Sequence, residues 1–421
     1  MELWVHLLEV LAACMFMVVY VWTSYNLPIL AVGVRNMRRS RRCRASPPVL
    51  KKFPTFSIVV PVKDEERVVG RLLDALLKLN YPRDKMEVIV VEDGSTDKTV
   101  EICTKYAEEH RGMVKFFRKQ FSNGKPSALN YGVRRAKGEI IGIFDADSVP
   151  DANALINVCK YFRDPKVAAV QGRTMSINSD ENMLTKFISY EEAVWCEAFL
   201  RGKDVLGLFV HLKGSCQFIR RDVLEKLGGF EDNALSEDME LSARLTEKGY
   251  RIRYASDVYA WQETPGDLKQ LLRQRTRWFR GTMEVALRHG KLMTRPSRKN
   301  LDAEITLFGP FMLTASLANY FMGLSALLFP FKFYALWGAL IQLMTLANTL
   351  TLVACGFALI YVSKPRRVAS VLWPLFVYFY WILQALIAFY AMSTILLRRP
   401  GKWAKTDKRG VISFNKNFGR P

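Results

Sequence analysis

The sequence predicts an α/β domain with a nucleotide-binding sheet, joined to α-helical transmembrane segments. Three observations predict this architecture. From about residue 53, short β-rich runs alternate with amphipathic helical repeats. Acidic residues follow directly after several of these runs. Apolar segments long enough to cross a bilayer precede and follow this region.

The 421-residue chain carries a formal net charge of +21. A strongly positive net charge occurs in nucleic-acid-binding proteins and also in membrane proteins. The arginines, however, gather beside apolar segments, at 35–44 and again at Arg366 and Arg367. This placement fits the positive-inside rule and attraction to anionic lipids, although a solvated basic linker at 35–52 explains any single arginine equally well. Since no nucleic-acid-binding module is visible, we expect no nucleic-acid partner.

The first apolar segment runs from Leu3 to about Val34, with no charge between Glu9 and Arg35. It is a poor signal peptide, because no cationic stretch precedes it and no small-residue cleavage site closes it. A signal-anchor helix fits better and keeps the following arginines in the cytosol. The seven scattered cysteines show no C-x-x-C spacing, so they indicate neither disulfides nor a zinc site and agree with a reducing cytosol.

The α/β region begins with a buried-strand pattern, FSIVVPV, and continues as helices alternating with strands. Such alternation predicts a parallel, doubly wound sheet whose ligand site lies beyond the carboxyl ends of its strands. Asp93, Asp145 and Asp147 all fall at such ends. The further runs are the helix VVGRLLDALLKL, the strand MEVIVVEDGS, the helix TVEICTKYAEEH, and the strands MVKFFRK and EIIGIF.

Apolar segments return at 305–330 and 334–362, and each is long enough to cross a bilayer. A third, 368–397, is interrupted early by Pro374. If all three crossed, the basic tail Arg398–Arg409 would lie outside, against the charge rule. We therefore expect two crossings, with the third segment lying in the interface or entering and returning.

Asp145-Ala146-Asp147 offers carboxylate oxygens to a hard divalent cation, Mg²⁺ or Mn²⁺, whose remaining ligands would be water and phosphate oxygens. Such a cation stabilises the negative charge that develops on a diphosphate when a sugar–diphosphate bond breaks. Spaced aspartates are also common in turns, so this pattern alone leaves both interpretations open.

Two turns carry further candidates. Asp93-Gly94 is either a plain turn, because Asp-Gly is a favoured turn pair, or it places a carboxylate against a nucleotide base or ribose. Gly124-Lys125 is either an exposed loop or a flexible turn that presents an ammonium group to a phosphate.

Two amphipathic helices are also ambiguous by themselves. Ser236-Glu237-Asp238 either caps the helix MELSARLTEKGY and complements its dipole, or Asp238 takes the proton from an attacking sugar or lipid hydroxyl. Gln274, Arg277 and Trp278 lie in the basic helix LKQLLRQRTRWFRGTMEVALR. That helix is either an interfacial anchor, or it places Arg277 against a diphosphate and Trp278 against an acceptor sugar.

Six motifs in order resemble those of family 2 inverting glycosyltransferases, and most closely the membrane-embedded cellulose, hyaluronan and poly-N-acetylglucosamine synthases. The resemblance covers most of residues 55–285 and implies a GT-A fold, a Rossmann-like mixed sheet that binds a nucleotide-sugar. The motifs are VPVKDEE, VEDGSTDKT, GKPSALNYG, FDADSVPD, LGGFEDNALSEDMELSARLTEKGYRIRY and QRTRW.

At the matching positions the resemblance implies a role for each motif residue. Asp238 would be the catalytic base, Asp147 the metal ligand, and Asp145 would lie on the nucleotide-sugar side. The sequence departs from the family at Lys63-Asp64 and at Glu92, where Tyr-Asn and Asp are more frequent. The other implied contacts are Pro61, Glu65 and Asp93 with the nucleotide, Lys125 near the diphosphate, Gln274, Arg277 and Trp278 at the diphosphate and acceptor end, and the loop Gly214–Gln217 on the acceptor side.

Trp403, Lys405 and Thr406 lie in a segment that resembles the W-x-K-T gating loop of these synthases, which closes over the nucleotide from the cytosol. Polymer-secreting relatives usually carry further membrane helices after this loop, whereas this sequence ends at Pro421. A homo-oligomer would supply a larger bundle, and transfer of one sugar to a lipid would need none.

Together these features predict an integral membrane glycosyltransferase, in the plasma membrane, with a cytoplasmic catalytic domain. It would pass sugar from a nucleotide-sugar, expected to be UDP-linked, to a growing polysaccharide through β-linkages. The alternative is transfer of a single sugar to a membrane lipid, and a catalytically silent binding subunit is disfavoured because every acidic motif position is intact. The expected divisions are a transmembrane helix at 1–34, a basic cytosolic linker at 35–52, the catalytic domain at 53–262, amphipathic interface helices at 263–300, two transmembrane helices at 301–362, an interfacial or re-entrant helix at 363–397, and a gating-loop-like cytosolic tail at 398–421.

Overall fold

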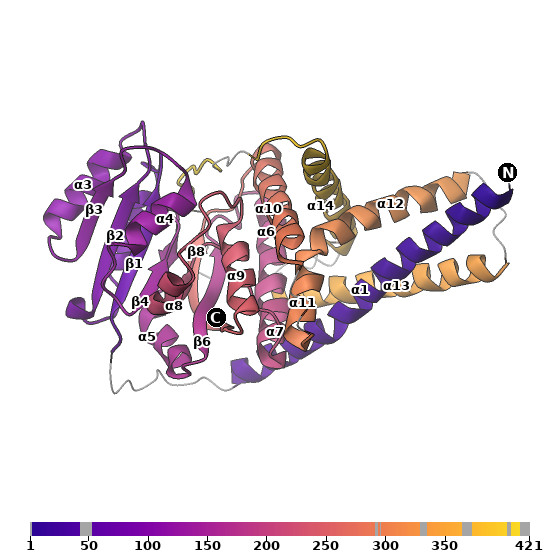
Figure 1. Ribbon diagram of the computed structural model, residues 1–421, viewed down its shortest axis with the longest axis horizontal. Helices are drawn as coiled ribbons and strands as arrows, with labels where there is room; N and C mark the ends of the chain where they lie inside the picture. Colours follow the sequence, from indigo (N-terminus) through magenta and orange to yellow (C-terminus); the bar gives the residue numbers. More distant parts are fainter. Residues whose placement is uncertain are drawn as a thin grey trace.

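The computed structural model describes residues 2–42, 53–290, 294, 296–328, 335–363, 373–401 and 406–412. Its centre is one eight-stranded mixed sheet of order β3–β2–β1–β4–β7–β6–β8–β5 (Figure 1). The strands are β1 Phe56–Val62, β2 Met86–Glu92, β3 Val114–Arg118, β4 Ile140–Ile143, β5 Val149–Pro150, β6 Val167–Ser176, β7 Gln217–Arg220 and β8 Arg251–Gln262.

The half of the sheet formed by β1 to β4 is parallel, which confirms the four strands and the doubly wound arrangement predicted for this region. The other half is mixed, because β7 runs antiparallel to both β4 and β6, and β5 runs antiparallel to β8. Since β2, β1 and β4 are parallel neighbours, their carboxyl ends meet at one edge of the sheet.

Both faces of the sheet are covered by helices, which explains why β1 and β2 are apolar at almost every position. On one face, Ile58 and Val60 of β1 pack with Leu72 and Leu76. On the other face, Val59 packs in a separate core with helices α4 and α9. The helices of this domain are α2 Val69–Leu77, α3 Thr99–Glu109, α4 Lys125–Val133, α5 Ala154–Cys159, α6 Met183–Val194, α7 Arg201–Leu206, α8 Arg221–Lys226, α9 Glu237–Glu247, α10 Leu268–His289 and α11 Arg298–Leu307, with short 3₁₀ helices at Arg83–Lys85 and Lys160–Arg163.

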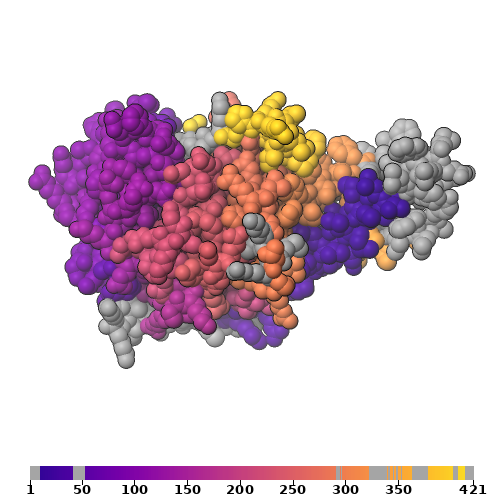
Figure 2. Space-filling view, in the orientation of Figure 1, coloured from indigo at the N-terminus to yellow at the C-terminus, as the bar shows by residue number. Residues whose placement is uncertain are grey.

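Four long helices complete the described part of the chain, and α1, α12 and α13 extend together away from the sheet (Figure 1). In Figure 2 the indigo atoms of α1 run from below the centre of the molecule toward the right, away from the violet atoms of the first strands at the left. Among the described residues, three stretches are long and apolar enough to cross a membrane: Val10–Ser40, Gln342–Val362 and Tyr378–Leu396. The long helices are α1 Glu2–Arg42, α12 Gly309–Leu328, α13 Ala335–Ser363 and α14 Trp373–Leu396.

One boundary differs from the sequence-based expectation. Helix α1 does not end near Val34 but continues through the arginine cluster to Arg42, because nothing in that cluster breaks a helix and arginine has high helix propensity. Pro374 lies in the first turn of α14, where proline is tolerated, and residues 368–372 of the last apolar segment lie outside the described residues. The placement of α14 in or across a bilayer stays a prediction.

Helix α1 lies directly against the catalytic domain at a π-helical turn, Trp195–Leu200, between α6 and α7. A β-carbon added to Gly33 of α1 would overlap the carbonyl oxygen of Ala198 in that turn, and one added to Gly202 of α7 would overlap the carbonyl oxygen of Ile29. These glycines therefore allow two backbones to touch, as small residues do between packed helices.

A buried ion pair joins the same elements. The Lys203 ammonium of α7 lies 2.9 and 3.0 Å from the two carboxylate oxygens of Asp302 in α11. The Tyr25 hydroxyl of α1 donates to Asp302 over 3.0 Å, and the Phe209 amide donates over 2.9 Å. Because every oxygen of this carboxylate has a donor, the pair fixes α1 and α11 to the catalytic domain.

Candidate active site

The acidic residues predicted at strand ends gather at the carboxyl edge of the parallel half of the sheet. Asp93 follows β2, and Asp145 and Asp147 follow β4, with β1 between these two strands. Because the carboxyl ends of these neighbouring strands lie close together, the three side chains are at the position where open α/β sheets bind ligands.

Asp93 organises the loop between β3 and α4. Its buried carboxylate accepts from the Lys119 ammonium over 2.5 Å, from the Ser122 hydroxyl over 3.1 Å, and from the amides of Asn123 and Gly124 over 3.2 and 2.8 Å. The turn interpretation of Asp93-Gly94 therefore holds for the backbone, because Gly94 has a φ of 84°. The carboxylate also shapes the loop that delivers Lys125.

Lys125 links the donor side of the site to the acidic end of α9. It is the first residue of α4, not part of a loop, and its ammonium lies 2.7 Å from Asp145 and 3.1 Å from Glu237. It also donates to the carbonyl of Gly214 over 3.1 Å. Burial alone would lower the pKa of Lys125, but Asp145 and Glu237 outweigh it and raise that pKa, so the lysine is charged.

Asp238 lies beside this lysine. A β-carbon on Gly214, whose φ is 80°, would lie 3.1 Å from the Lys125 ammonium and 3.2 Å from the Asp238 carboxylate, so both groups border the same glycine. Burial, and then the neighbouring Glu237 carboxylate, raise the pKa of Asp238 to about 7, although Lys125 and Arg277 act in the opposite direction. A carboxylate with such a pKa suits a general base near neutral pH.

Asp147 is held by the end of the chain. Its buried carboxylate accepts from the Lys408 ammonium over 2.7 Å and from the Glu263 amide over 2.9 Å. The Glu263 carboxylate in turn accepts from the amides of Arg409 and Gly410 over 2.8 and 2.9 Å. Residues 406–412 thus run across the upper edge of the catalytic domain and close one side of the site (Figure 1).

The carboxylates of Asp145 and Asp147 have the donor chemistry that Mg²⁺ and Mn²⁺ prefer. Within the described part of the chain, no group of three or more His, Cys, Asp or Glu side chains is arranged to hold a metal ion. The pair therefore fits a cation whose other ligands are water and the phosphate oxygens of a bound nucleotide, as Mg²⁺ sites with one or two carboxylates usually are.

The remaining predicted residues lie around this centre. Glu65, whose amide donates to the Thr99 hydroxyl over 2.7 Å, contributes to raising the pKa of Lys408 and so lies near it. Pro61 is in β1 beside Val91 of β2. The Thr406 hydroxyl is buried without a hydrogen-bond partner among the described residues, whereas Trp403 and Lys405 lie outside those residues.

The predicted residues of α10, Gln274, Arg277 and Trp278, have different surroundings. Arg277 is close enough to Asp238 to lower the pKa of that carboxyl, whereas the predicted contact of this arginine with a diphosphate stays a prediction. Trp278 is 37% exposed, and the Arg275 guanidinium lies 4.6 Å from the centre of its ring. Arg275 is fixed by Glu191, 2.6 Å away, and Gln274 is half-buried on the same helix.

Three residues of the site were not among the predicted site residues. Lys408 and Glu263 hold Asp147, and the Arg71 side chain donates to the Asp147 carbonyl over 3.3 Å. Lys408 stood next to the predicted gating motif, so its position was the one available hint. Glu263 and Arg71 occur outside every motif and are brought to Asp147 by the fold alone.

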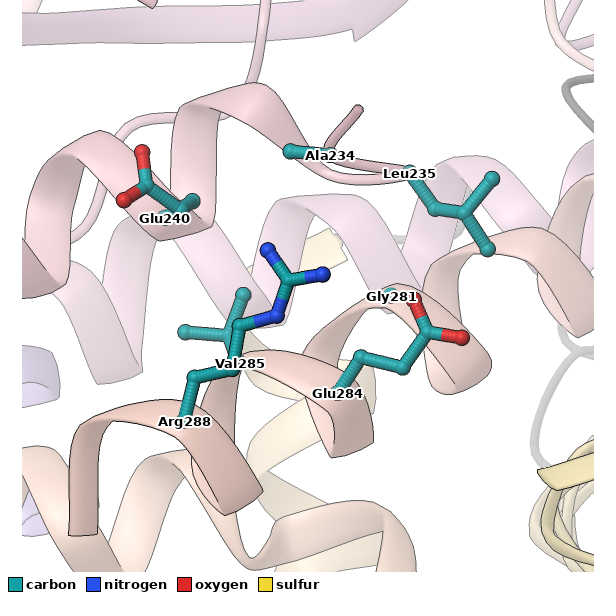
Figure 3. Close-up of a pocket in the computed structure, with 7 residues that line it drawn as sticks. All are labelled: Ala234, Leu235, Glu240, Gly281, Glu284, Val285 and Arg288. Atoms are coloured by element: carbon teal, nitrogen blue, oxygen red, sulfur yellow. The ribbon is translucent and has the colours of Figure 1, made fainter. Parts of the chain in front are cut away.

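A small hollow lies between α9 and α10 (Figure 3). It has room for about one water molecule, and both of its acidic residues are already paired, Glu240 with Arg244 over 2.7 Å and Glu284 with Arg280 over 2.8 Å. It is therefore a packing defect and not a substrate site. The lining residues are Ala234, Leu235, Glu240, Gly281, Glu284, Val285 and Arg288.

Comparison with known proteins agrees with this geometry. The family described as "Glycosyltransferase like family 2" matches residues 54–281. The probable glycosyltransferase YdaM of Bacillus subtilis (strain 168) is 32% identical over 294 residues, which are 69% of this chain and 70% of that protein.

Two further relatives have more specific names. Beta-monoglucosyldiacylglycerol synthase of Nostoc sp. (strain PCC 7120) is 32% identical over 281 residues, 65% of this chain, but the match spans only 59% of that relative. Poly-beta-1,6-N-acetyl-D-glucosamine synthase of Staphylococcus epidermidis is 25% identical over 377 residues, 85% of this chain and 88% of that protein.

Among solved structures, the mannosyltransferase PcManGT from Pyrobaculum calidifontis, in complex with GDP-Man and Mn²⁺, aligns with a TM-score of 0.58 at 21% identity. The alignment covers 91% of this chain and 99% of that one. The two proteins share a fold, and the GT-A type of mixed sheet expected from the motifs is confirmed.

Proposed function

The chain belongs to glycosyltransferase family 2, and from this premise we propose that it is a membrane-embedded inverting enzyme. It moves a sugar from a nucleotide-sugar, UDP-linked by our expectation, to an acceptor hydroxyl and forms a β-linkage. The observation that carries the proposal is the position of Lys125, which joins Asp145 on the donor side to the acidic pair Glu237-Asp238 on the acceptor side.

The donor half of the site is formed by Pro61, Glu65 and Asp93 for the nucleotide and by Lys125 for the diphosphate. Asp145 and Asp147 would hold Mg²⁺ or Mn²⁺, which when bound neutralises charge on the leaving diphosphate. Arg277 supplies further positive charge from the opposite side. These assignments follow the strand ends and the ion pairs that converge on them.

The acceptor half centres on Asp238. In the deprotonated state its carboxylate takes the proton of the acceptor hydroxyl as the oxygen attacks the anomeric carbon from the face opposite the diphosphate. This direction of attack inverts the configuration of that carbon. Gln274 and Trp278 line the acceptor end, and the partly exposed indole of Trp278 offers a flat apolar surface to a sugar ring.

Residues 398–412 form the cytoplasmic tail in this proposal, and the segment with Trp403, Lys405 and Thr406 closes over the nucleotide. Helix α1 and the apolar segments 305–330 and 334–362 cross the membrane in this proposal, which keeps the basic tail on the cytoplasmic side. The buried contacts of α1 with the π turn and with Asp302 support a catalytic domain that sits at the membrane surface.

The acceptor is a growing polysaccharide in our first proposal, because the motif around Trp278 and the gating-type segment occur together. A membrane lipid that receives one sugar is the second candidate, supported by the relatives named for monoglucosyldiacylglycerol synthesis. Transfer to either acceptor uses the same chemistry at Asp238. The two differ in the part of the acceptor that extends past Trp278, which is a polysaccharide in one case and a lipid in the other.

The deciding experiment supplies purified enzyme with lipid vesicles and a panel of labelled UDP- and GDP-sugars, with and without Mn²⁺. Product size then separates the two acceptors: a ladder of polysaccharide supports the first proposal, and a product limited to one sugar on lipid replaces it with the second. An absence of transfer from every donor, with nucleotide bound, would refute the enzyme assignment.

A further inference from the structure

Each aspartate of the proposed cation site is already paired with a lysine from a distant part of the chain. The Lys125 ammonium lies 2.7 Å from Asp145, and the Lys408 ammonium lies 2.7 Å from Asp147. The side chains of the two lysines are only 14% and 16% exposed, so solvent screens these pairs weakly. Two positive charges therefore balance the same two carboxylates that a divalent cation would need.

Both lysines have other acceptors that keep them in place. Lys408 also donates to the carbonyl of Glu263 over 2.7 Å, and the Glu263 carboxylate binds the two amides that follow Lys408 in the chain. Lys125 also contacts Glu237 and the carbonyl of Gly214. If a cation took the aspartates, neither ammonium would leave the site.

This arrangement makes the charge of the site depend on what binds. A cation that arrives alone would lie beside two retained ammonium groups, which repel it at short range in a partly buried setting. A diphosphate that arrives alone would meet lysines already occupied by carboxylates. When both arrive together, the cation satisfies the carboxylates and the lysines become free to bind phosphate oxygens.

We propose that Lys125 and Lys408 exchange partners when the donor binds, from Asp145 and Asp147 to the donor diphosphate, and that this exchange makes cation and nucleotide binding cooperative. The inference rests on the proposed function for the location of the donor. It adds a thermodynamic coupling between two ligands, which by reciprocity must appear in the affinity of each. Couplings of this kind are typically roughly 5- to 150-fold.

The test measures Mn²⁺ binding to the full chain in detergent by the loss of the free Mn²⁺ signal in electron paramagnetic resonance. Titrations are run without nucleotide and with saturating UDP or GDP. In the wild type we expect nucleotide to tighten Mn²⁺ binding by roughly tenfold or more. Asp147→Asn should weaken Mn²⁺ binding in the presence of nucleotide, and if it does not, the cation site is elsewhere and the proposal is overturned.

Lys408→Met distinguishes exchange from simple phosphate binding. We expect Mn²⁺ alone to bind more tightly to this variant, because its competitor has gone, and the nucleotide effect to shrink. Lys408→Arg should keep the coupling, and Lys105→Met, an exposed lysine of α3, should behave as wild type. Unchanged or weaker binding of Mn²⁺ alone to Lys408→Met would overturn the proposal.

The readout separates this proposal from the enzymatic one. Binding of Mn²⁺ and nucleotide requires no sugar transfer, so cooperative binding without turnover would leave the exchange standing and remove the glycosyltransferase activity. Sugar transfer by an enzyme in which Lys408→Met does not change Mn²⁺ binding would confirm the glycosyltransferase activity and refute the exchange.

Discussion

Replacing Asp238 by asparagine tests the assignment of the catalytic base with little change of shape. One oxygen of Asp238 accepts from the Met239 amide over 2.7 Å, and the amide oxygen of asparagine can keep that bond. The ion pairs of Lys125 with Asp145 and Glu237 do not involve Asp238, so the donor side should stay assembled. What is lost is the group that removes the proton from the acceptor.

The size of the loss follows from the chemistry. A positioned general base contributes roughly 10²- to 10⁴-fold to the rate, which corresponds to about 3–5.5 kcal/mol of transition-state stabilisation. We therefore expect kcat for transfer to fall by that factor, while the Kd for nucleotide changes little. The measurement is the initial rate of labelled sugar transfer, combined with calorimetric binding of UDP or GDP.

The matched control is Asp222→Asn, on the exposed helix α8, where the aspartate has only a surface pair with Lys226. It should transfer sugar at the wild-type rate. If Asp238→Asn kept more than about a tenth of the wild-type rate, a loss too small for a general base, the base would be another group and the reasoning from its raised pKa would be wrong.

Three further predictions concern pH and the junction with the apolar helices. Because only the deprotonated carboxylate of Asp238 can accept a proton, and its pKa is raised to about 7, kcat/KM should rise as pH increases through about 7; a flat profile from pH 5 to 9 would contradict this. Gly33→Ala forces a β-carbon into the facing backbone carbonyl and should lower the unfolding free energy by roughly 1–3 kcal/mol in thermal unfolding, whereas Gly290→Ala, with open space around it, should not. Lys203→Met leaves a buried carboxylate without its cation and should cost roughly 3–5 kcal/mol, and a loss no larger than that of the surface variant Lys226→Met would refute the structural role of the pair.

The sequence was most informative where local pattern and burial agree. The strands β1, β2 and β4 were predicted because their runs are mostly apolar, as expected of strands covered on both faces. The edge strand β3, VKFFR, was predicted from its β-rich run although it contains charged residues. The acidic residues after β2 and β4 were predicted to lie at the ligand-binding edge of the sheet, because all strands of a parallel sheet have their carboxyl ends at the same edge.

The pairing of charges was beyond the reach of the sequence. Lys408 meets Asp147, and Lys119 meets Asp93, through loops whose course depends on tertiary packing. Charged residues have no periodicity that identifies their partners, so the sequence indicated Lys125 but not its pairing with Asp145, and it indicated neither Lys119 nor Lys408 as a partner of an aspartate. The π turn at Trp195–Leu200 was not predicted either.

The glycine contacts of Gly33 and Gly202 have a mechanical consequence. Two backbones in contact cannot adjust through a change of side-chain rotamer. The long helices α1, α12 and α13 and the catalytic domain should therefore move as one rigid body. A domain joined to a membrane helix by a flexible linker can change its position to find an acceptor. A rigid body of this kind keeps its active site at a fixed distance from the apolar helices. In the proposed membrane arrangement, an acceptor would then have to reach the site itself, and the thickness of the bilayer would determine how far it must travel.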